Sequence, residues 1–254
     1  MKRFLIFLIV ICFMTVSLPL KTCAAGTSYS WYCKRVGGNA QPPLPAEFSF
    51  IEKYPCIWLD KSGSKKVYLT FDAGYENGNI EKILDVLKDK NVKGAFFILV
   101  NLIDTNPELV QRIADEGHLV CNHTAHHKNM SKITEANVFK SELDILSDAY
   151  TALTGKQIAK YYRPPEGTFS EINLKMAQDL GYKTVLWSFA YADWDNAAQP
   201  SHEFAKKKIL ENVHDGAVIL LHPTSATNAA VLSDVIDEIR AKGYEFGILD
   251  DIKQ

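Results

Sequence analysis

The sequence predicts an α/β protein, a distorted (β/α) barrel of about seven strands preceded by an N-terminal arm. From Lys66 onward, short β-branched and aromatic runs alternate with segments whose apolar residues recur at helical spacing. This alternation indicates a parallel sheet covered by helices. Polar residues of catalytic type also follow nearly every run. A barrel mouth has this pattern, whereas a doubly wound sheet, the alternative, concentrates such residues at one crossover point.

The predicted strands are apolar runs that stop at polar or turn residues. The first, Val67–Asp72, is β-branched and aromatic, and Ala73 and Gly74 follow its terminal acid. Runs of this composition bounded by turn residues are typical of buried strands. Six more are predicted at residues 94–100, 118–123, 161–164, 182–189, 217–222 and 244–249.

The predicted helices lie between these runs, where apolar residues recur three and four positions apart. Asn106-Pro107 opens one of them with a cap followed by a first-turn proline, and Gly117 closes it. The other helices are expected at about residues 79–90, 134–153, 170–180, 201–213 and 228–241.

The first 25 residues have the layout of a secretory signal. Two basic residues precede an uncharged apolar run, residues 4–20, and small residues surround Ala25. We expect an exported protein from which residues 1–25 are cleaved. The alternative is an uncleaved membrane anchor, because the run is close to the minimum spanning length. Residues 26–65 are rich in turn-forming and aromatic residues, and we expect an ordered arm packed on the main domain.

Charge and cysteine content restrict the partners. The 254 residues carry a formal charge of −2, and without residues 1–25 the chain has 25 basic and 30 acidic residues, a charge of −5. Such a chain has no basic footprint for nucleic acid, and we expect a monomer without an organic cofactor. Export permits a disulfide, for which Cys33 and Cys56 are the candidate pair. Cys121 is expected to be a buried apolar residue.

Three of the polar segments that follow strands carry residues suited to catalysis. Asp72 ends the first strand. His123 and His127 can face one metal ion because they are four residues apart, with His126 pointing elsewhere. Arg163, at the end of a short strand, can hold a carboxylate in a bidentate pair. Taken singly, each segment is also compatible with a solvated turn or loop.

Two later segments extend this set. His222 follows a strongly apolar strand, and Asp193 can keep it protonated because a nearby carboxylate raises a histidine pKa. The alternative for His222 is a buried, hydrogen-bonded histidine. Tyr75, Trp187 and Trp194 are candidates for stacking on a sugar ring, with core packing as the alternative.

Taken together and in order, these segments resemble the five motifs of the polysaccharide deacetylases, the carbohydrate esterases with a NodB-homology domain. The resemblance covers about residues 66–254. The motifs are Thr70-Phe-Asp-Ala-Gly74, His123-Thr-Ala-His-His127, Arg163-Pro-Pro-Glu-Gly167, Asp193-Trp194 and Leu220-Leu-His222. Further segments are similar to the delta-lactam-biosynthetic de-N-acetylases, which act on muramic acid in spore-cortex peptidoglycan. These segments are Tyr29-Ser-Trp31, Tyr75-Glu-Asn-Gly78 and Phe169-Ser-Glu171.

The resemblance implies a hydrolase that removes N-acetyl groups from peptidoglycan strands. The implied substrate is N-acetylmuramic acid without its stem peptide, as a step toward the muramic δ-lactam of spore cortex. Asp72 matches the general base and Arg163 the residue that holds it ionised. His222 matches the general acid, kept charged by Asp193.

The resemblance also implies a divalent metal ion and a sugar-binding surface. His123 and His127 match the metal ligands, and zinc is the expected ion, with other divalent ions as alternatives. Pro165 in the third motif is expected to contact the sugar together with the three aromatic residues named above. Glu166 replaces the aromatic residue that is usual beside this proline, so we expect the sugar contact to differ here.

One departure from the family pattern concerns the metal. Ala73 stands where most members have a second acid that ligates the ion, so we expect weak metal binding, with Asp72, Glu76 or Asn77 as substitute ligands. Two other functions stay open. One is deacetylation of another glycan, such as wall N-acetylglucosamine or chitin oligomers. The other is a glycan-binding barrel without catalysis, which only Ala73 supports.

Overall fold

The computed structural model describes residues 26–253, so the expected signal segment lies outside the described residues. All seven predicted strands are present, with bounds that differ by a few residues. They are β3 (Lys66–Ala73), β4 (Ala95–Ile98), β5 (Leu119–Asn122), β6 (Ala159–Tyr162), β8 (Lys183–Val185), β9 (Ala217–Leu221) and β10 (Glu245–Gly247). The arm adds β2 (Cys56–Ile57) to the same sheet, and β1 (Tyr29–Ser30) pairs with β7 (Thr168–Phe169).

The main sheet is parallel and curls into the predicted distorted barrel. Its order is β10-β3-β4-β5-β6-β8-β2, and β9 also pairs with β3. The two ends of the sheet meet through single bridges, Phe189 to Ile219 and Leu59 to Ala217. The barrel therefore closes by isolated contacts and not by a continuous ladder.

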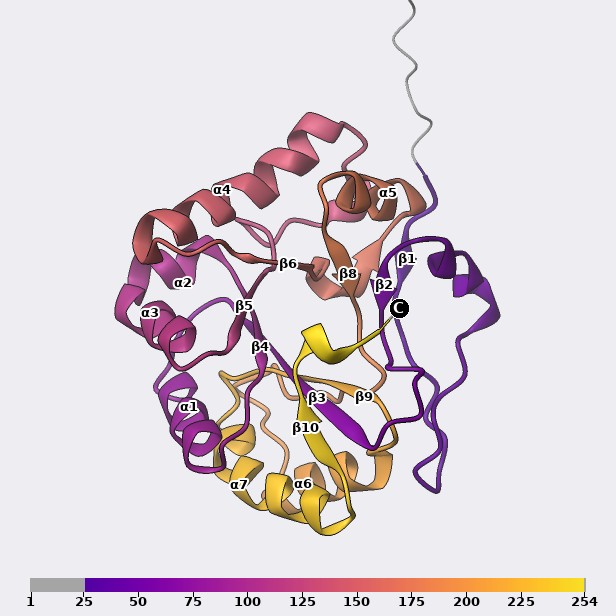
Figure 1. Ribbon diagram of the computed structural model, residues 1–254, viewed down its shortest axis with the longest axis vertical. Coiled ribbons are helices and arrows are strands. Elements are labelled where there is room, and N and C mark those ends of the chain that lie inside the picture. The colour runs from indigo at the N-terminus through magenta and orange to yellow at the C-terminus, as the bar shows by residue number, and fades with distance from the viewer. Residues whose placement is uncertain (1–25, 254) are drawn as a thin grey trace, which may run out of the picture.

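Helices surround the outside of the sheet (Figure 1). They are α1 (Ile80–Asp89), α2 (Val100–Thr105), α3 (Pro107–Asp115), α4 (Ala136–Thr154), α5 (Glu171–Asp179), α6 (His202–Asn212) and α7 (Ala226–Ala241). Short 3₁₀ turns complete the order, namely η1 (Ala46–Lys53), η2 (Met130–Lys132), η3 (Pro165–Gly167) and η4 (Leu249–Asp251). Among residues 26–253, no helix is long and apolar enough to cross a bilayer.

Two of the predicted strands end before other backbone structure that the sequence did not indicate. The predicted strand over residues 182–189 ends at Val185, because the chain then bends so that Trp187 lines a cavity and only Phe189 rejoins the sheet. The predicted strand over residues 94–100 stops at Ile98, and the six-residue helix α2 follows. Leu99 and Val100 are apolar like the strand before them, so composition alone did not separate strand from helix.

Strand alternation divides the core into two layers. Along β3, Val67, Leu69 and Phe71 face the helices, whereas Tyr68 belongs to the cluster inside the barrel. Since successive side chains point to opposite faces of a strand, Thr70 and Asp72 face the interior with Tyr68. The last polar residue of β3 is therefore aimed into the barrel mouth.

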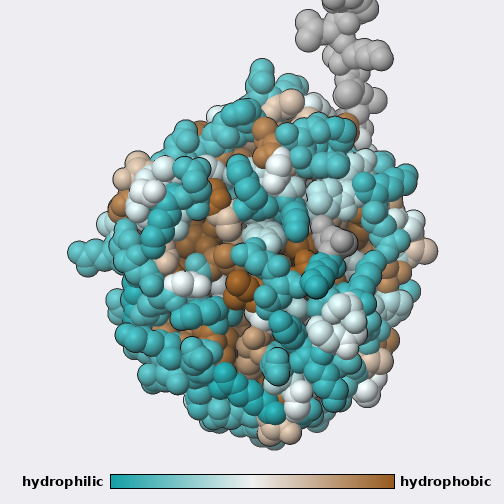
Figure 2. Space-filling view, in the orientation of Figure 1, coloured by the Kyte–Doolittle hydropathy of each residue, from teal (hydrophilic) through white to brown (hydrophobic). Residues whose placement is uncertain are grey.

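The end of the barrel opposite the carboxyl ends of the strands is filled by the C-terminal segment. The turn η4 crosses the middle of the barrel (Figure 1), and Leu249 and Ile252 join the interior cluster. Asp250 in this turn accepts a hydrogen bond from the hydroxyl of Tyr161 in β6 at 2.7 Å, which ties the turn to the sheet. The face seen in this orientation is mostly hydrophilic, with smaller hydrophobic patches among the hydrophilic residues (Figure 2).

The N-terminal arm packs on the barrel by its aromatic residues. Trp31, Phe48 and Trp58 form a buried cluster with Phe169 of β7. The Trp31 indole also donates a hydrogen bond to the backbone oxygen of Trp187 at 2.8 Å. The arm therefore supports the segment that carries Trp187.

The disulfide considered between Cys33 and Cys56 is not formed. Cys33 and Cys56 are not bonded to each other, because their thiols lie against different parts of the chain. Cys56 hydrogen bonds with Thr184, whereas Cys33 lies beside Arg35 and the backbone of Ala190. Burial raises the pKa of the Cys33 thiol to about 11, which favours its protonated form.

Candidate active site

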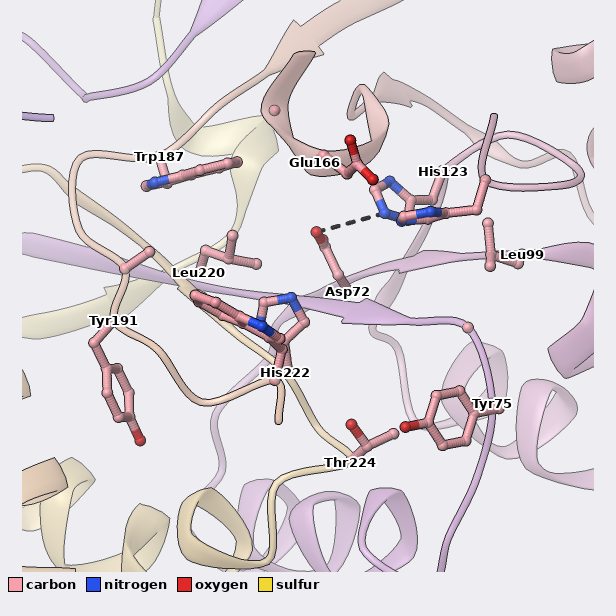
Figure 3. Close-up of a pocket in the computed structure, with 15 residues that line it drawn as sticks. Asp72, Tyr75, Leu99, His123, Glu166, Trp187, Tyr191, Leu220, His222 and Thr224 are labelled. Atoms are coloured by element: carbon pink, nitrogen blue, oxygen red, sulfur yellow. Dashed lines mark ion pairs between the residues drawn. The ribbon is translucent and has the colours of Figure 1, made fainter. Parts of the chain in front are cut away.

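A cavity of about 670 Å³ opens at the carboxyl ends of the strands. The carboxyl ends of parallel strands meet at one face of a barrel, so residues distant in sequence gather there. Figure 3 shows Asp72, His123, Glu166, Trp187 and His222 around this space. The other lining residues are Gly74, Tyr75, Leu99, His127, Gly167, Ala190, Tyr191, Trp194, Leu220 and Thr224.

At the base of the cavity, Asp72 is paired with a fully buried Arg163. The guanidinium Nη1 donates to Asp72 Oδ1 at 2.7 Å, and Nη2 donates to the Thr70 hydroxyl at 2.8 Å. Its remaining donors reach the backbone oxygens of Val185 and Leu186. Burial opposes ionisation of Asp72, but the charge of Arg163 outweighs it, with help from the charge of His222, and lowers the pKa of Asp72. Asp72 is therefore an ionised carboxylate that Arg163 holds in place at the cavity, suited to act as a base.

The histidine pair lies beside this carboxylate. The rings of His123 and His127 are 5.0 Å apart between centroids, and His123 Nε2 lies 3.6 Å from Asp72 Oδ2. His123 Nδ1 is 2.9 Å from the backbone oxygen of Arg163 and so carries the proton. This leaves Nε2 as an acceptor, the usual arrangement of a metal-ligating imidazole. Burial lowers the pKa of His123 to about 4, so the ring is neutral. His126 turns away to Glu142, as expected.

On the other side of the cavity, Asp193 holds His222. Asp193 Oδ1 accepts from His222 Nδ1 at 2.7 Å, and Oδ2 accepts from the backbone N–H of His222 at 2.9 Å and from Asn228 at 2.6 Å. Burial of His222 opposes its charge, but the hydrogen bond and negative charge of Asp193 outweigh burial and raise its pKa. Because Nδ1 is engaged, His222 has its second nitrogen, Nε2, available as a proton donor.

Aromatic side chains form the cavity mouth. Tyr75 and Trp194 are exposed at 46% and 60%, which excludes core packing for both. The Tyr75 hydroxyl accepts a hydrogen bond from Asn196 at 2.7 Å, which links the loop after β3 to the loop that holds Trp194. Trp187 is half-buried and Tyr191 is buried, and both also line the cavity. The exposed rings have the character of a sugar-stacking surface.

The third motif differs from the expectation. Pro165 is buried and is not among the residues that line the cavity, so the sugar contact expected of it stays a prediction that the cavity geometry does not support. Glu166 and Gly167 have left-handed backbones, φ 57° and 64°, and this turn directs Glu166 toward the cavity instead. An added Cβ at Gly167 would lie 2.6 Å from the Trp187 ring. The glycine therefore permits the close approach of this turn to Trp187.

Two of the substitute metal ligands are engaged elsewhere. Glu76 accepts a hydrogen bond from the backbone N–H of Ile80 at the start of α1, and Asn77 donates to the backbone oxygen of Thr224. Ala73 is buried among the apolar residues outside the barrel and does not line the cavity.

His123 and His127 nevertheless fit a divalent ion by chemistry and by tautomer, as two of its ligands. Among residues 26–253, no three His, Cys, Asp or Glu side chains are grouped so that they could hold a metal ion.

Sequence reasoning missed several supporting residues. Thr70 and Asn228 anchor Arg163 and Asp193, and Tyr191 and Thr224 line the wall. The position of Thr70, two residues before Asp72 on one strand, was an available signal because such residues share a face. Asn228 lies on α7, and only the packing of that helix brings it to Asp193.

A barrel mouth with a charge-paired carboxylate, a charge-paired imidazole and a histidine pair is the site of a hydrolase acting on N-acetyl amide bonds. The chain belongs to the polysaccharide deacetylase family, whose model matches residues 60–185. It is 41% identical to the Bacillus subtilis peptidoglycan-N-acetylmuramic acid deacetylase PdaA over 225 residues, covering 88% of this chain and 85% of the relative.

Two further comparisons agree with this placement. The structure of Bacillus subtilis PdaA, a family 4 carbohydrate esterase, matches with a TM-score of 0.86 and 39% identity, covering 89% of this chain and 96% of that one. A Bacillus cereus peptidoglycan-N-acetylglucosamine deacetylase is 33% identical over 211 residues, covering 82% of this chain and 75% of the relative.

Proposed function

We propose that this chain removes N-acetyl groups from peptidoglycan strands by metal-dependent hydrolysis. The observation that carries the proposal is that one cavity contains an ionised Asp72, a charge-paired His222 and the His123–His127 pair. N-acetylmuramic acid without its stem peptide is the first candidate substrate, supported by the 41% identity to PdaA. The free amine would then be available to form a δ-lactam with the lactyl carboxyl, as a step in spore-cortex synthesis.

The residues supply the proton transfers of amide hydrolysis. Asp72 takes a proton from the attacking water, and Arg163 keeps it ionised until then. His222 gives a proton to the departing amine, and Asp193 stabilises the charged imidazole before the transfer. His123 and His127 would hold the ion, and its chemistry in such a site is polarisation of the acetyl carbonyl and activation of water. Zinc suits this imidazole set, although other divalent ions accept it too.

One observation favours a second substrate, N-acetylglucosamine. Among the described residues that line the cavity there is no lysine or arginine. The lactyl carboxylate of stripped muramic acid would therefore find no flexible cation there, whereas N-acetylglucosamine needs none. The identity of 33% to an N-acetylglucosamine deacetylase makes this a concrete alternative.

The substrate implies where the protein acts. We place it outside the cytoplasm, as a monomer on the glycan strands of the wall, which agrees with the signal-like residues 1–25 of the sequence. A chain with 25 basic and 30 acidic residues beyond that segment has no footprint for nucleic acid.

The deciding experiment treats two glycan preparations with the chain from Gly26 and added zinc. One preparation keeps its stem peptides and the other has been stripped by an amidase, and mass spectrometry locates acetyl loss. Loss confined to stripped muramic residues supports the first substrate, and loss from glucosamine replaces it with the second. Glycan binding without acetyl loss would refute hydrolysis.

A matched pair of variants ties the activity to this site. Asp72→Asn should lower kcat by about 10²–10⁴-fold, the usual contribution of a general base. Asp104→Asn makes the same chemical change on exposed helix α2 and should leave kcat unchanged.

A further inference from the structure

The loop between Asp193 and Gln199 carries two parts of the site without any helix or strand of its own. Asp193, at one end, is 1% exposed and holds His222 at 2.7 Å. Trp194, the next residue, is 60% exposed at the cavity mouth. Residues 194–198 are all exposed, so no core packing fixes them. The position of the loop therefore depends on the hydrogen bonds that hold it.

The Gln199 side chain supplies such hydrogen bonds from both ends of its amide. Its Nε2 donates to the backbone oxygens of Asp193 and Asp195, each at 2.9 Å. Its Oε1 accepts from the Ser225 hydroxyl and from the backbone N–H of Thr227 at 3.4 Å. Two carbonyl oxygens on one side and an N–H on the other admit only this orientation of the amide. Gln199 therefore joins the loop to the start of helix α7.

The same helix start supports the carboxylate of Asp193. Ser225 caps α7, because its hydroxyl accepts from the backbone N–H of Asn228. Asn228 in turn donates from Nδ2 to Asp193 Oδ2 at 2.6 Å and to the backbone oxygen of His222 at 3.1 Å. Gln199 and Asn228 thus hold the backbone and the carboxylate of Asp193 against one helix end. Loss of the Gln199 amide would release the backbone half of this arrangement.

Other residues of the loop reach the mouth of the cavity. Asn196 donates to the Tyr75 hydroxyl at 2.7 Å, and the Trp194 ring lies 6.1 Å from the His222 ring between centroids. One short loop therefore positions an aromatic side chain of the mouth together with the residue that supports the imidazole. A displacement of this loop would change both the sugar contact and the proton transfer.

We infer that Gln199 is a positioning residue, which aligns Asp193 with His222 and holds Trp194 at the mouth. It is not among the residues that line the cavity, so it acts through the loop and not on the substrate. The inference rests on the proposed function, because His222 is the general acid of that reaction. A merely structural glutamine would contribute to the free energy of unfolding without altering the pKa of His222 or sugar binding.

The variant Gln199→Met tests this role, because it keeps most of the side-chain volume and removes all four hydrogen bonds. NMR titration of the imidazole signals measures the pKa of His222 without using activity. That pKa should fall in the variant, because Asp193 is held less closely against the ring. The other charged groups that act on this ring, Asp72 and Arg163, are unchanged.

Kinetics on glycan oligomers, with the chain from Gly26 and added zinc, give the second measurement. The alkaline limb of the kcat profile should move to lower pH together with the pKa of His222. Gln199→Met should also lower kcat by up to about 100-fold, the cost of a small displacement of a catalytic group. KM should rise by about 2–10-fold, because the aromatic contact at the mouth is weakened.

Two further variants separate positioning from stability. Gln199→Asn keeps the amide but is one methylene shorter, and should lower the pKa of His222 by less. Gln111→Met removes a glutamine that donates to Asp115 on helix α3, and should behave like the parent. A lower free energy of unfolding for Gln199→Met with the pKa of His222 and KM unchanged would overturn the positioning role. A parent that releases no acetate, while the pKa of His222 still falls in Gln199→Met, would keep the positioning role and refute hydrolysis instead.

Discussion

Replacing Arg163 with methionine removes the cation that holds Asp72 ionised and keeps much of the apolar volume. Arg163 is fully buried, and the Asp72 side chain is 12% exposed. Removing one partner of a buried pair leaves an uncompensated charge and costs about 3–5 kcal/mol. We expect Arg163→Met to lower the free energy of unfolding by that amount at pH 7, as measured by urea denaturation of the chain from Gly26.

The pH dependence gives the sign of the effect. In the parent, the lowered pKa of Asp72 contributes stability that is present above the unfolded pKa and is lost as pH falls through the folded pKa. In Arg163→Met burial remains and the main opposing charge is gone, so the pKa of Asp72 rises. Protonation then relieves the variant, and the stability difference from the parent should shrink as pH falls.

Two controls separate this mechanism from loss of packing. Arg112→Met removes an arginine that pairs with Glu116 and Asp85 at the surface, and should cost about 1 kcal/mol or less. Adding Asp72→Asn to Arg163→Met removes the stranded charge and should restore much of the loss. Equal losses for the two arginine variants, or no restoration by Asp72→Asn, would refute the reasoning.

Three further changes address the acid, the mouth and the turn. Activity should fall as pH rises through the raised pKa of His222, and Asp193→Asn should move this alkaline limb of the kcat profile to lower pH. Trp194→Ala removes a 60% exposed ring and should weaken glycan binding by about 0.5–1.5 kcal/mol. KM for glycan oligomers should rise accordingly, with kcat nearly unchanged. Gly167→Ala combines φ 64° with a 2.6 Å contact to Trp187, and should lower the free energy of unfolding by about 1–3 kcal/mol in urea denaturation.

Each of these changes has its own control or contradicting result. An unmoved alkaline limb in Asp193→Asn would remove His222 from the proton transfer. Phe204→Ala deletes an exposed ring outside the cavity, and a KM change equal to that of Trp194→Ala would show that stacking is not the cause. Gly63→Ala has φ 74° with open space around it, so it should cost less than Gly167→Ala if the Trp187 contact matters.

Much of the fold followed from periodicity. The seven predicted strands and the helices between them are present, because alternating apolar runs leave few other ways to bury both faces of a sheet. The two-residue strand β2 was not predicted, since it depends on pairing with β8 and not on its own composition. The disulfide failed for the same reason, because cysteine spacing does not encode the distance between two thiols.

The site residues were predictable where a residue of catalytic type lies at or just after the end of an apolar strand. Asp72, His123 and His222 were found because each ends or follows an apolar strand. The burial of Pro165 and the exposure of Glu166 did not follow from the sequence, because the left-handed backbone at Glu166 cannot be recognised from the local residue pattern. Asn228 was missed because a helix far along the chain brings it to Asp193.

The filling of the barrel by the C-terminal segment has a consequence for the folding rate. Thr70 of β3 bonds to Ile219 of β9, 149 residues later, and Leu249 and Ile252 complete the interior. Such a high contact order makes folding slow, since these distant segments must meet before the core can form. A growing chain therefore cannot complete this core until almost all of the barrel has been synthesised, and its apolar strands stay unburied until then.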